Sequence, residues 1–162
     1  LYSILEPTYS NKQKIKWVAT NNCFFKKQIL NKTNLTFNQN LKNIGGSDEL
    51  FFRKLTKKGF SIMWNSKAAV VEYSQADREN YNWFLKRNFR YGYSGLIIDK
   101  NIYGKINGYF MNIFKLVFLI LLSLINLFFI FRKYNFIKSL FYLVKAGGRF
   151  LSIFGYRINK YQ

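Results

Sequence analysis

The stretch Gly45-Gly46-Ser47-Asp48-Glu49-Leu50-Phe51-Phe52-Arg53-Lys54-Leu55 is the part of the chain around which we expect the fold to be organised. It holds two of the seven acidic residues in a 162-residue chain that carries 26 Lys and Arg. The glycine pair predicts a flexible turn that can bring backbone close to a ligand. Ser47 is a good N-cap, and acidic residues in the first turn suit the positive end of the helix dipole. We therefore predict a helix that ends near Lys58, where Gly59 supplies a stop signal.

The two adjacent carboxylates of this stretch are expected on different faces of the helix. Asp48 shares its face with Phe51 and Leu55, which are candidates for the core. Glu49 precedes Arg53 by four residues, which is the spacing of a solvated ion pair. Asp48 is thus expected at the mouth of the buried face, where a carboxylate can act as a general base. The alternative, which local chemistry alone favours, is that Asp48 only supports the helix N-terminus.

The order of short elements around this helix resembles the C-terminal half of the catalytic domain of family 2 glycosyltransferases. The segments that carry the resemblance are 45–55, Gly59-Phe60-Ser61-Ile62-Met63-Trp64 and Ala68-Ala69-Val70-Val71-Glu72. In that family a Gly-Gly-(Glu/Ser)-Asp segment opens a helix, and its Asp deprotonates the acceptor hydroxyl. Asp48 is the matching position, so the resemblance assigns it the catalytic role. The resemblance covers Ala19 to Arg90 and extends more loosely to Tyr161.

The resemblance implies an α/β fold. Residues 1–98 would be the C-terminal portion of a GT-A nucleotide-sugar transferase domain, and residues 99–162 a membrane-associated helical tail. The implied activity is an inverting transfer of a sugar from a nucleotide-sugar donor to a hydroxyl of a glycan or lipid-linked acceptor, in polysaccharide biosynthesis of the cell envelope. The family also implies Mg²⁺ or Mn²⁺ bound by an Asp-x-Asp motif, which does not occur in this chain. Because Leu1 is not a start methionine, we expect that motif in a preceding N-terminal half, without which the fragment would be inactive.

Further substrate-binding positions are expected near Asp48 and after the last predicted strand. Short apolar runs predict strands at 17–20, 60–64 and 68–73. The resemblance places the asparagine pair after the first strand beside the active site, and turn formation is the alternative for both residues. Gln75-Ala76-Asp77-Arg78-Glu79 keeps the Gln and Arg of a Gln-x-x-Arg-Trp motif that helps to hold glycan and nucleotide in membrane-bound synthases, with Glu in place of Trp. The expected substrate-binding residues are Asn21, Asn22, Gly45, Gly46, Ser47, Gln75 and Arg78.

The C-terminal part of the chain is the candidate membrane region. Tyr109–Phe131 has Lys115 as its one charge, and a span needs ~20 mainly apolar residues, so a transmembrane helix is predicted there. Residues 136–154 mix apolar with basic residues and predict an interfacial helix or a helical return. A basic, amphipathic helix is predicted over 77–92, either in the membrane interface or on the catalytic core. We expect a basic collar where the catalytic part meets the membrane, formed by Lys86, Arg87, Arg90, Arg132, Lys133, Lys138, Lys145 and Arg149.

Composition limits the classes of chemistry. The net charge of +19 and the pI of about 10.1 indicate an anionic partner, such as a membrane surface, a nucleic acid or a phosphorylated substrate. The chain has no His and one cysteine, Cys23, which excludes a disulfide framework and a thiolate metal cluster within it. We expect membrane lipids rather than nucleic acid as partners, and a bacterial inner-membrane location with the catalytic part cytoplasmic. Two alternatives stay open: a non-enzymatic basic membrane-binding module, and a nucleic-acid binder, against which the apolar segment argues.

Overall fold

The computed structural model describes residues 9–71, 73, 78 and 80–155. These residues belong to two compact units. We call Pro7–Tyr73 the N-terminal unit, and we call the unit that contains residues 74–162 the helical unit.

The described chain as a whole is mostly helical, so the α/β fold expected from the sequence is wrong. Five α-helices lie in the described residues, whereas the sheet there consists of two strands of two residues each. Strand β1 (Lys14–Ile15) pairs antiparallel with β2 (Ile62–Met63), with Lys14 opposite Met63. Only the predicted strand at 60–64 contains a strand, and the described residues of 17–20 and 68–73 form none. An α/β nucleotide-binding domain needs a larger, mainly parallel sheet covered by helices, which this pair of strands does not provide.

The core of the N-terminal unit surrounds α2 (Ser47–Lys57). Buried Phe51, Phe52 and Leu55 form its centre, and the ring of Phe37 stacks on Phe51 with centroids 4.4 Å apart. The runs that predicted strands supply part of the shell instead, because a short apolar run can be buried equally well in strand, helix or loop. The partly buried residues packed on the centre, some of them from helix α1 (Gln28–Thr33), are Val18, Cys23, Phe25, Ile29, Leu30, Leu35, Phe60 and Ile62.

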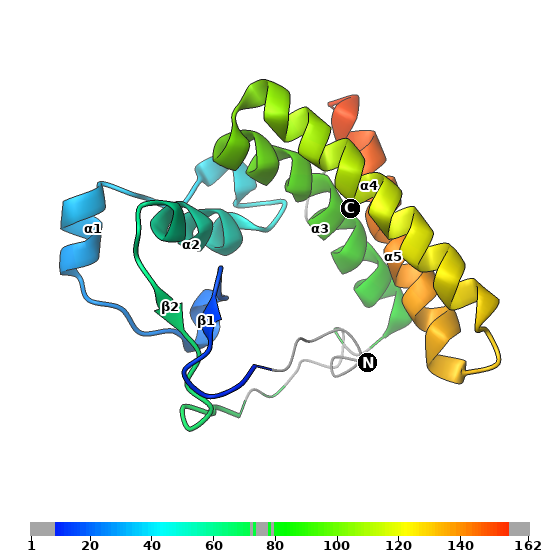
Figure 1. The fold of residues 1–162 in the computed structure, drawn as a ribbon, viewed down its shortest axis with the longest axis horizontal. Helices are drawn as coiled ribbons and strands as arrows, with labels where there is room; N and C mark the ends of the chain where they lie inside the picture. The colour runs from blue at the N-terminus through cyan, green and yellow to red at the C-terminus, as the bar shows by residue number, and fades with distance from the viewer. Residues whose placement is uncertain (1–8, 72, 74–77, 79, 156–162) are drawn as a thin grey trace. The chain divides into compact units, whose positions relative to one another are not determined.

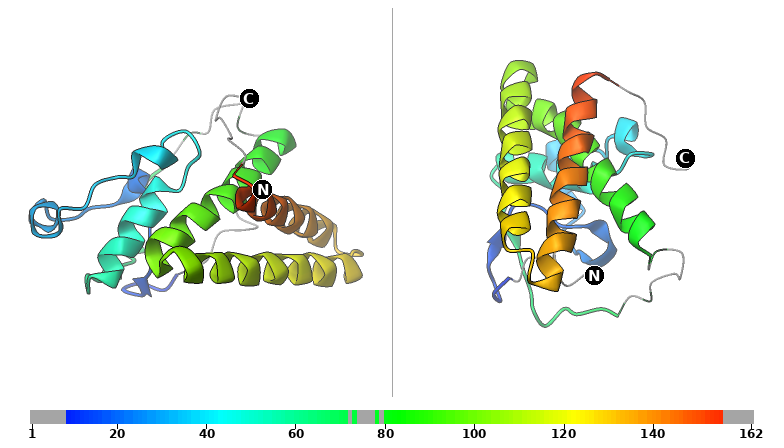
Figure 2. Two further views of the ribbon diagram at one scale, coloured as in Figure 1. Left: turned by 90° about the horizontal axis from the view of Figure 1, so that it is seen from above. Right: turned by 90° about the vertical axis from the view of Figure 1, so that its right-hand side faces the viewer.

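The helical unit consists of three long helices that pack side by side (Figures 1 and 2). They are α3 (Tyr81–Tyr103), α4 (Lys105–Phe128) and α5 (Lys133–Ile153). Gly104, with φ +87°, reverses the chain between α3 and α4. The helix predicted over 77–92 therefore continues to Tyr103, because no Pro or αL residue interrupts it before Gly104.

Glycines let α3 approach its two neighbours at the distance of backbone contact. A Cβ atom on Gly92 would lie 2.0 Å from the carbonyl oxygen of Lys145, and one on Gly148 would lie 2.1 Å from that of Phe89. On α4, a Cβ atom on Gly108 would lie 2.5 Å from a Cα atom of α3. Small residues at helix interfaces are typical of helices that associate in membranes, where close backbone approach replaces the hydrophobic effect as the source of attraction.

Helix α4 buries the polar residues Asn112 and Ser123 and exposes most of its large apolar residues. Its four buried residues are Gly108, Asn112, Leu119 and Ser123. Of the helices in the described part of the chain, α4 is the one long and apolar enough to cross a membrane. Its exposed large apolar side chains are Ile106, Phe110, Ile113, Phe114, Val117, Phe118, Ile120, Leu121, Leu124, Ile125, Leu127 and Phe128.

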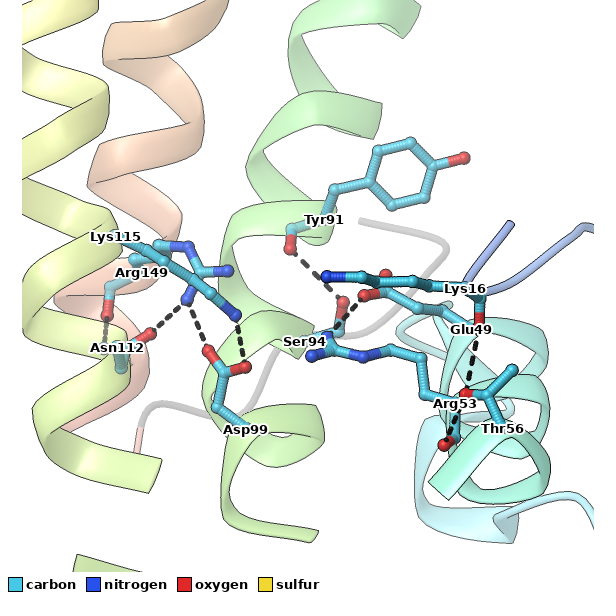
Figure 3. A network of polar contacts seen from close by, with 10 residues as sticks. All are labelled: Lys16, Glu49, Arg53, Thr56, Tyr91, Ser94, Asp99, Asn112, Lys115 and Arg149. Atoms are coloured by element: carbon cyan, nitrogen blue, oxygen red, sulfur yellow. Dashed lines mark hydrogen bonds and ion pairs between the residues drawn. The ribbon is translucent and has the colours of Figure 1, made fainter. Parts of the chain in front are cut away.

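A buried ionic cluster joins the three helices (Figure 3). Asp99 of α3 is fully buried and accepts hydrogen bonds from Lys115 of α4 and from Arg149 of α5, the latter at 3.0 Å. Arg149 also donates to Oδ1 of Asn112 at 2.7 Å. The one charge in the predicted transmembrane segment, Lys115, is therefore directed inward to a carboxylate. Arg149 is only 8% exposed, so its expected place in a surface collar is wrong: the buried Asp99 holds it inside the unit.

Candidate functional site

The glycine pair before α2 places Asp48 in the first turn of the helix. Gly45 and Gly46 have φ +96° and +89°, values that residues with a side chain rarely adopt, so the tight entry into α2 depends on both glycines. Gly46 is the N-cap and Ser47 is the first helical residue, which corrects the predicted N-cap by one position. The Ser47 hydroxyl donates instead to the carbonyl oxygen of Asn38 at 3.3 Å. Helix α2 ends at Lys57 before the predicted stop.

A hydrogen-bonded pair between Asp48 and Thr20 is the main feature of the site. Oδ2 of Asp48 accepts from the backbone N–H of Thr20 at 3.1 Å and from its hydroxyl Oγ1 at 2.8 Å. Thr20 begins a 3₁₀ turn, Thr20–Asn22, which lies 28 residues before Asp48 in the chain. Among the described residues, none donates a hydrogen bond to Oδ1 of Asp48, whose side chain is partly exposed.

The contact to Asp48 is made by Thr20 and not by the asparagines predicted beside it. Asn21 and Asn22 are both exposed, and the Asn22 side chain donates to the carbonyl oxygen of Ala68 at 2.8 Å. The predicted segment is thus next to the carboxylate, while the residue in contact with it was missed. Nothing in the sequence pointed to Thr20, because only the path of the folded chain brings the two residues together.

Glu49 differs from Asp48 in its partner. Its carboxylate accepts from Arg53 at 3.0 Å, the i,i+4 pair expected from the spacing (Figure 3). The side chains are 29% and 16% exposed, so the pair is less solvated than expected. The Glu49 carboxylate is thus paired with the guanidinium of Arg53, whereas the Asp48 carboxylate accepts hydrogen bonds from the neutral N–H and hydroxyl groups of Thr20.

Cys23 lies close enough to Asp48 to sense its charge. Burial raises the pKa of the Cys23 thiol, and the negative charge of Asp48 raises this pKa further. The thiolate, which is the nucleophilic form of cysteine, is therefore disfavoured. Cys23 is not a candidate nucleophile, but its titration reports the charge of Asp48.

Two of the predicted positions, Arg78 and Gln75, do not belong to the N-terminal unit. Arg78 is exposed in the helical unit, and Gln75 lies outside the described residues. Across the described ranges, no three His, Cys, Asp or Glu side chains are grouped so that they could hold a metal ion. The Mg²⁺ or Mn²⁺ that the resemblance implies is expected at an Asp-x-Asp motif that does not occur in this chain, so this finding does not bear on that expectation.

Comparisons with known proteins do not identify a family for this chain. It matches no family model, no curated protein and no solved structure. The function is therefore argued from the geometry around Asp48 and from the polarity of the helical unit.

Proposed function

We propose that this chain is part of a glycosyltransferase that transfers a sugar from a nucleotide-sugar donor to a hydroxyl of a glycan or lipid-linked acceptor, with Asp48 as the general base. The observation that carries the proposal is the pair of hydrogen bonds from Thr20 to one carboxylate oxygen of Asp48, at 3.1 and 2.8 Å. They orient the carboxylate, and no described residue donates to its other oxygen. The resemblance of segment 45–55 to family 2 glycosyltransferases supports the same role.

The proposed chemistry is a single displacement. Oδ1 of Asp48 takes the proton from the acceptor hydroxyl while the hydroxyl oxygen forms a bond to the anomeric carbon of the donor sugar. The bond from that carbon to the diphosphate oxygen breaks, and the nucleoside diphosphate leaves with the bonding electrons. One displacement inverts the configuration at the anomeric carbon. A positioned base of this kind contributes ~10²–10⁴-fold to the rate.

The residues around Asp48 are proposed to bind the acceptor. A Cβ atom on Gly45 would meet nothing within 4 Å, so the glycine turn is open to a ligand. The partly exposed backbone at this turn and the exposed amides of the residues after Thr20 can supply donors and acceptors for sugar hydroxyls. The proposed substrate-binding residues within the N-terminal unit are Asn21, Asn22, Gly45, Gly46 and Ser47.

The catalytic role is tested by a matched pair of variants in the full-length enzyme. Asp48→Asn keeps the shape of the side chain and removes the base, so turnover should fall at least ~100-fold. Glu49→Gln removes the neighbouring carboxylate and should change turnover little. Circular dichroism would show that both variants keep their helix content. Equal losses in the two variants, or an active Asp48→Asn enzyme, would rule out Asp48 as the base.

The polarity of the helical unit supports attachment of this enzyme to a membrane. The apolar outer face of α4 would be covered by lipid, and the polar residues inside are already paired with one another. A lipid-linked acceptor would then lie at the surface to which the enzyme is attached. We place the enzyme at the cytoplasmic side of a bacterial inner membrane, where such acceptors are glycosylated.

A non-enzymatic membrane-binding module is the second candidate, because the exposed apolar face of α4 accounts for membrane binding without any role for Asp48. The two candidates differ in the effect of Asp48→Asn. A transferase would lose activity with its membrane binding intact. A binding module would show no transferase activity in the native full-length protein, and its membrane binding would be the same in the native protein and the variant.

A further inference from the structure

The three helices of the helical unit differ sharply in the polarity of the side chains that they expose. The outer face of α4 is apolar along its whole length, from Ile106 to Phe128. Helix α5 adds an apolar stripe at helical spacing, whereas the large apolar or aromatic side chains that α3 exposes are all tyrosines. The α5 stripe consists of Phe136, Leu143, Phe150 and Phe154, and the exposed tyrosines of α3 are Tyr81, Tyr91 and Tyr103.

The exposed surface of α3 is polar and basic. Asn82, Lys86 and Asn101 are exposed, and Arg90 is partly exposed. Arg87 lies over the ring of Trp83, 4.9 Å from its centroid, and its Nε donates to the Tyr91 hydroxyl at 2.8 Å. Aromatic side chains that present an apolar ring and a polar tip, together with long basic side chains, are typical of the layer between water and hydrocarbon. The unit therefore has an apolar side, made by α4 and α5, and a basic, aromatic side on α3.

Helix α3 is tied to both other helices along its length. Its C-terminal half contacts α4, where Asp99 pairs with Lys115. Its N-terminal half contacts α5, where Phe84 stacks on Phe141 with centroids 6.1 Å apart. If α4 and α5 crossed a bilayer, α3 would have to enter the bilayer with them. Lys86 lies about 26 Å of helix from the end of α3 at Tyr103, so it would be drawn into a hydrocarbon layer ~30 Å thick, where exposed charges are strongly disfavoured.

We infer that the helical unit lies in the plane of a single leaflet of anionic phospholipid instead of crossing the bilayer. The apolar side of α4 and α5 would be immersed in the acyl chains, and the basic side of α3 would lie among the phosphates. The net charge of +19 complements such a surface, and each basic residue near it strengthens the attachment. This inference rests on the membrane attachment proposed above and is independent of glycosyl transfer.

The buried polar groups agree with this orientation. Lys115 is the one charged residue of α4 after Lys105, and it is directed to Asp99 inside the unit. Ser123 donates to the carbonyl oxygen of Ser139 at 3.0 Å, which satisfies a polar group of α4 within the α4–α5 contact. The apolar side can therefore enter hydrocarbon along its full length without carrying an unpaired charge. Lys105 lies at the first residue of α4, where its long side chain can reach the phosphates.

Depth measurements on α4 test the inference directly. In the full chain with Cys23→Ser, single cysteines would replace Phe110, Val117, Leu121 or Phe128, which are exposed on one face of α4. Each would carry a nitroxide label in vesicles of phosphatidylcholine and phosphatidylglycerol. Accessibility to oxygen and to a water-soluble nickel complex gives the depth of each label. An in-plane helix predicts one similar, shallow depth at all four positions.

A spanning helix predicts a different profile and would overturn the inference. The first and last labels are 18 residues apart, or about 27 Å along the axis, so they would lie near opposite surfaces with the middle labels at the bilayer centre. Lys86→Cys on α3 is the control position, and its label should be accessible to the nickel complex. Full accessibility of all the α4 labels to nickel would also overturn the inference, because it would mean that this face of α4 lies in water and not in lipid. Circular dichroism would confirm the helix content of each variant, and none of these outcomes depends on transferase activity.

Discussion

Two adjacent glycines of α5 provide a sharp test of the helix packing. Gly148 faces α3, and a Cβ atom there would lie 2.1 Å from the carbonyl oxygen of Phe89 and 2.9 Å from the backbone nitrogen of Tyr93. Gly147 faces open space, with nothing within 4 Å of an added Cβ atom. Ala in place of either glycine gains ~0.5–1 kcal/mol of helix propensity, so the two substitutions differ only in their contacts.

The contacts of the two glycines give the expected difference in the free energy of unfolding between Gly148→Ala and Gly147→Ala. Ordinary contact begins at 3.4 Å, so the Phe89 oxygen and the Gly148 methyl would have to move apart by about 1.3 Å from their 2.1 Å distance. The obstacle is helix backbone, which cannot rotate away, so the overpacking penalty should approach the upper end of the ~1–3 kcal/mol range. The free energy of unfolding should then differ by ~3 kcal/mol between the variants, with Gly147→Ala equal to or more stable than the native chain.

Thermal unfolding measures this difference. Both variants and the native chain would be melted in the same mild detergent at one scan rate and followed by circular dichroism. For a unit of this size, ~1 kcal/mol corresponds to ~4–8 °C, so Gly148→Ala should melt at least ~12 °C below Gly147→Ala. Equal melting temperatures would refute the close approach of α3 and α5, and a lower melting temperature for Gly147→Ala would place the wrong face of α5 against α3.

Two other predictions concern the buried carboxylate and the cysteine. Asp99→Asn should destabilise the helical unit by ~3–5 kcal/mol, because it leaves a buried guanidinium without its counter-ion, whereas Lys86→Gln on the exposed face should change stability by less than ~0.5 kcal/mol in the same melts. Similar shifts in both variants would contradict the buried ionic cluster. Asp48→Asn should lower the pKa of the Cys23 thiol, because it removes one of the two causes that raise it. The pH midpoint of Cys23 alkylation by iodoacetamide should therefore move to lower pH, and an unchanged midpoint would mean that no charged Asp48 lies beside the thiol.

The features that the sequence predicted correctly are those set by residues within a few turns of one another. The helix after the glycine pair begins and ends within a residue of the predicted bounds, because glycines with positive φ stand at both ends. The ion pair of Glu49 with Arg53 follows from the helical repeat alone. The long apolar segment forms α4, because its composition permits no other element of that length.

The predicted sheet was wrong because a sheet depends on pairing between residues that are far apart in the sequence. A strand is stable only when a partner elsewhere in the chain pairs with it, and a short apolar run does not specify that partner. Val18 packs against the aromatic core around α2 and needs no strand to do so. The expectation of an α/β domain depended on the resemblance of short segments, and the N-terminal unit accommodates all three runs with only the two-residue strand β2 among their described residues.

The sequence by itself determined the helix after the glycine pair and the long apolar helix α4, because both depend on signals that are local in the chain. Tertiary structure alone decided which distant residues meet: Thr20 with Asp48 across 28 positions, and Asp99 with Arg149 across 50. It also decided that Arg149 is buried while Lys86 is exposed, although both are basic residues in amphipathic helices. Such pairings depend on how whole helices dock against one another. Close contacts such as that of Gly148 with α3 set this docking. The neighbouring residue, Gly147, is chemically identical but lies in open space, so the sequence does not show which of the two glycines makes the contact.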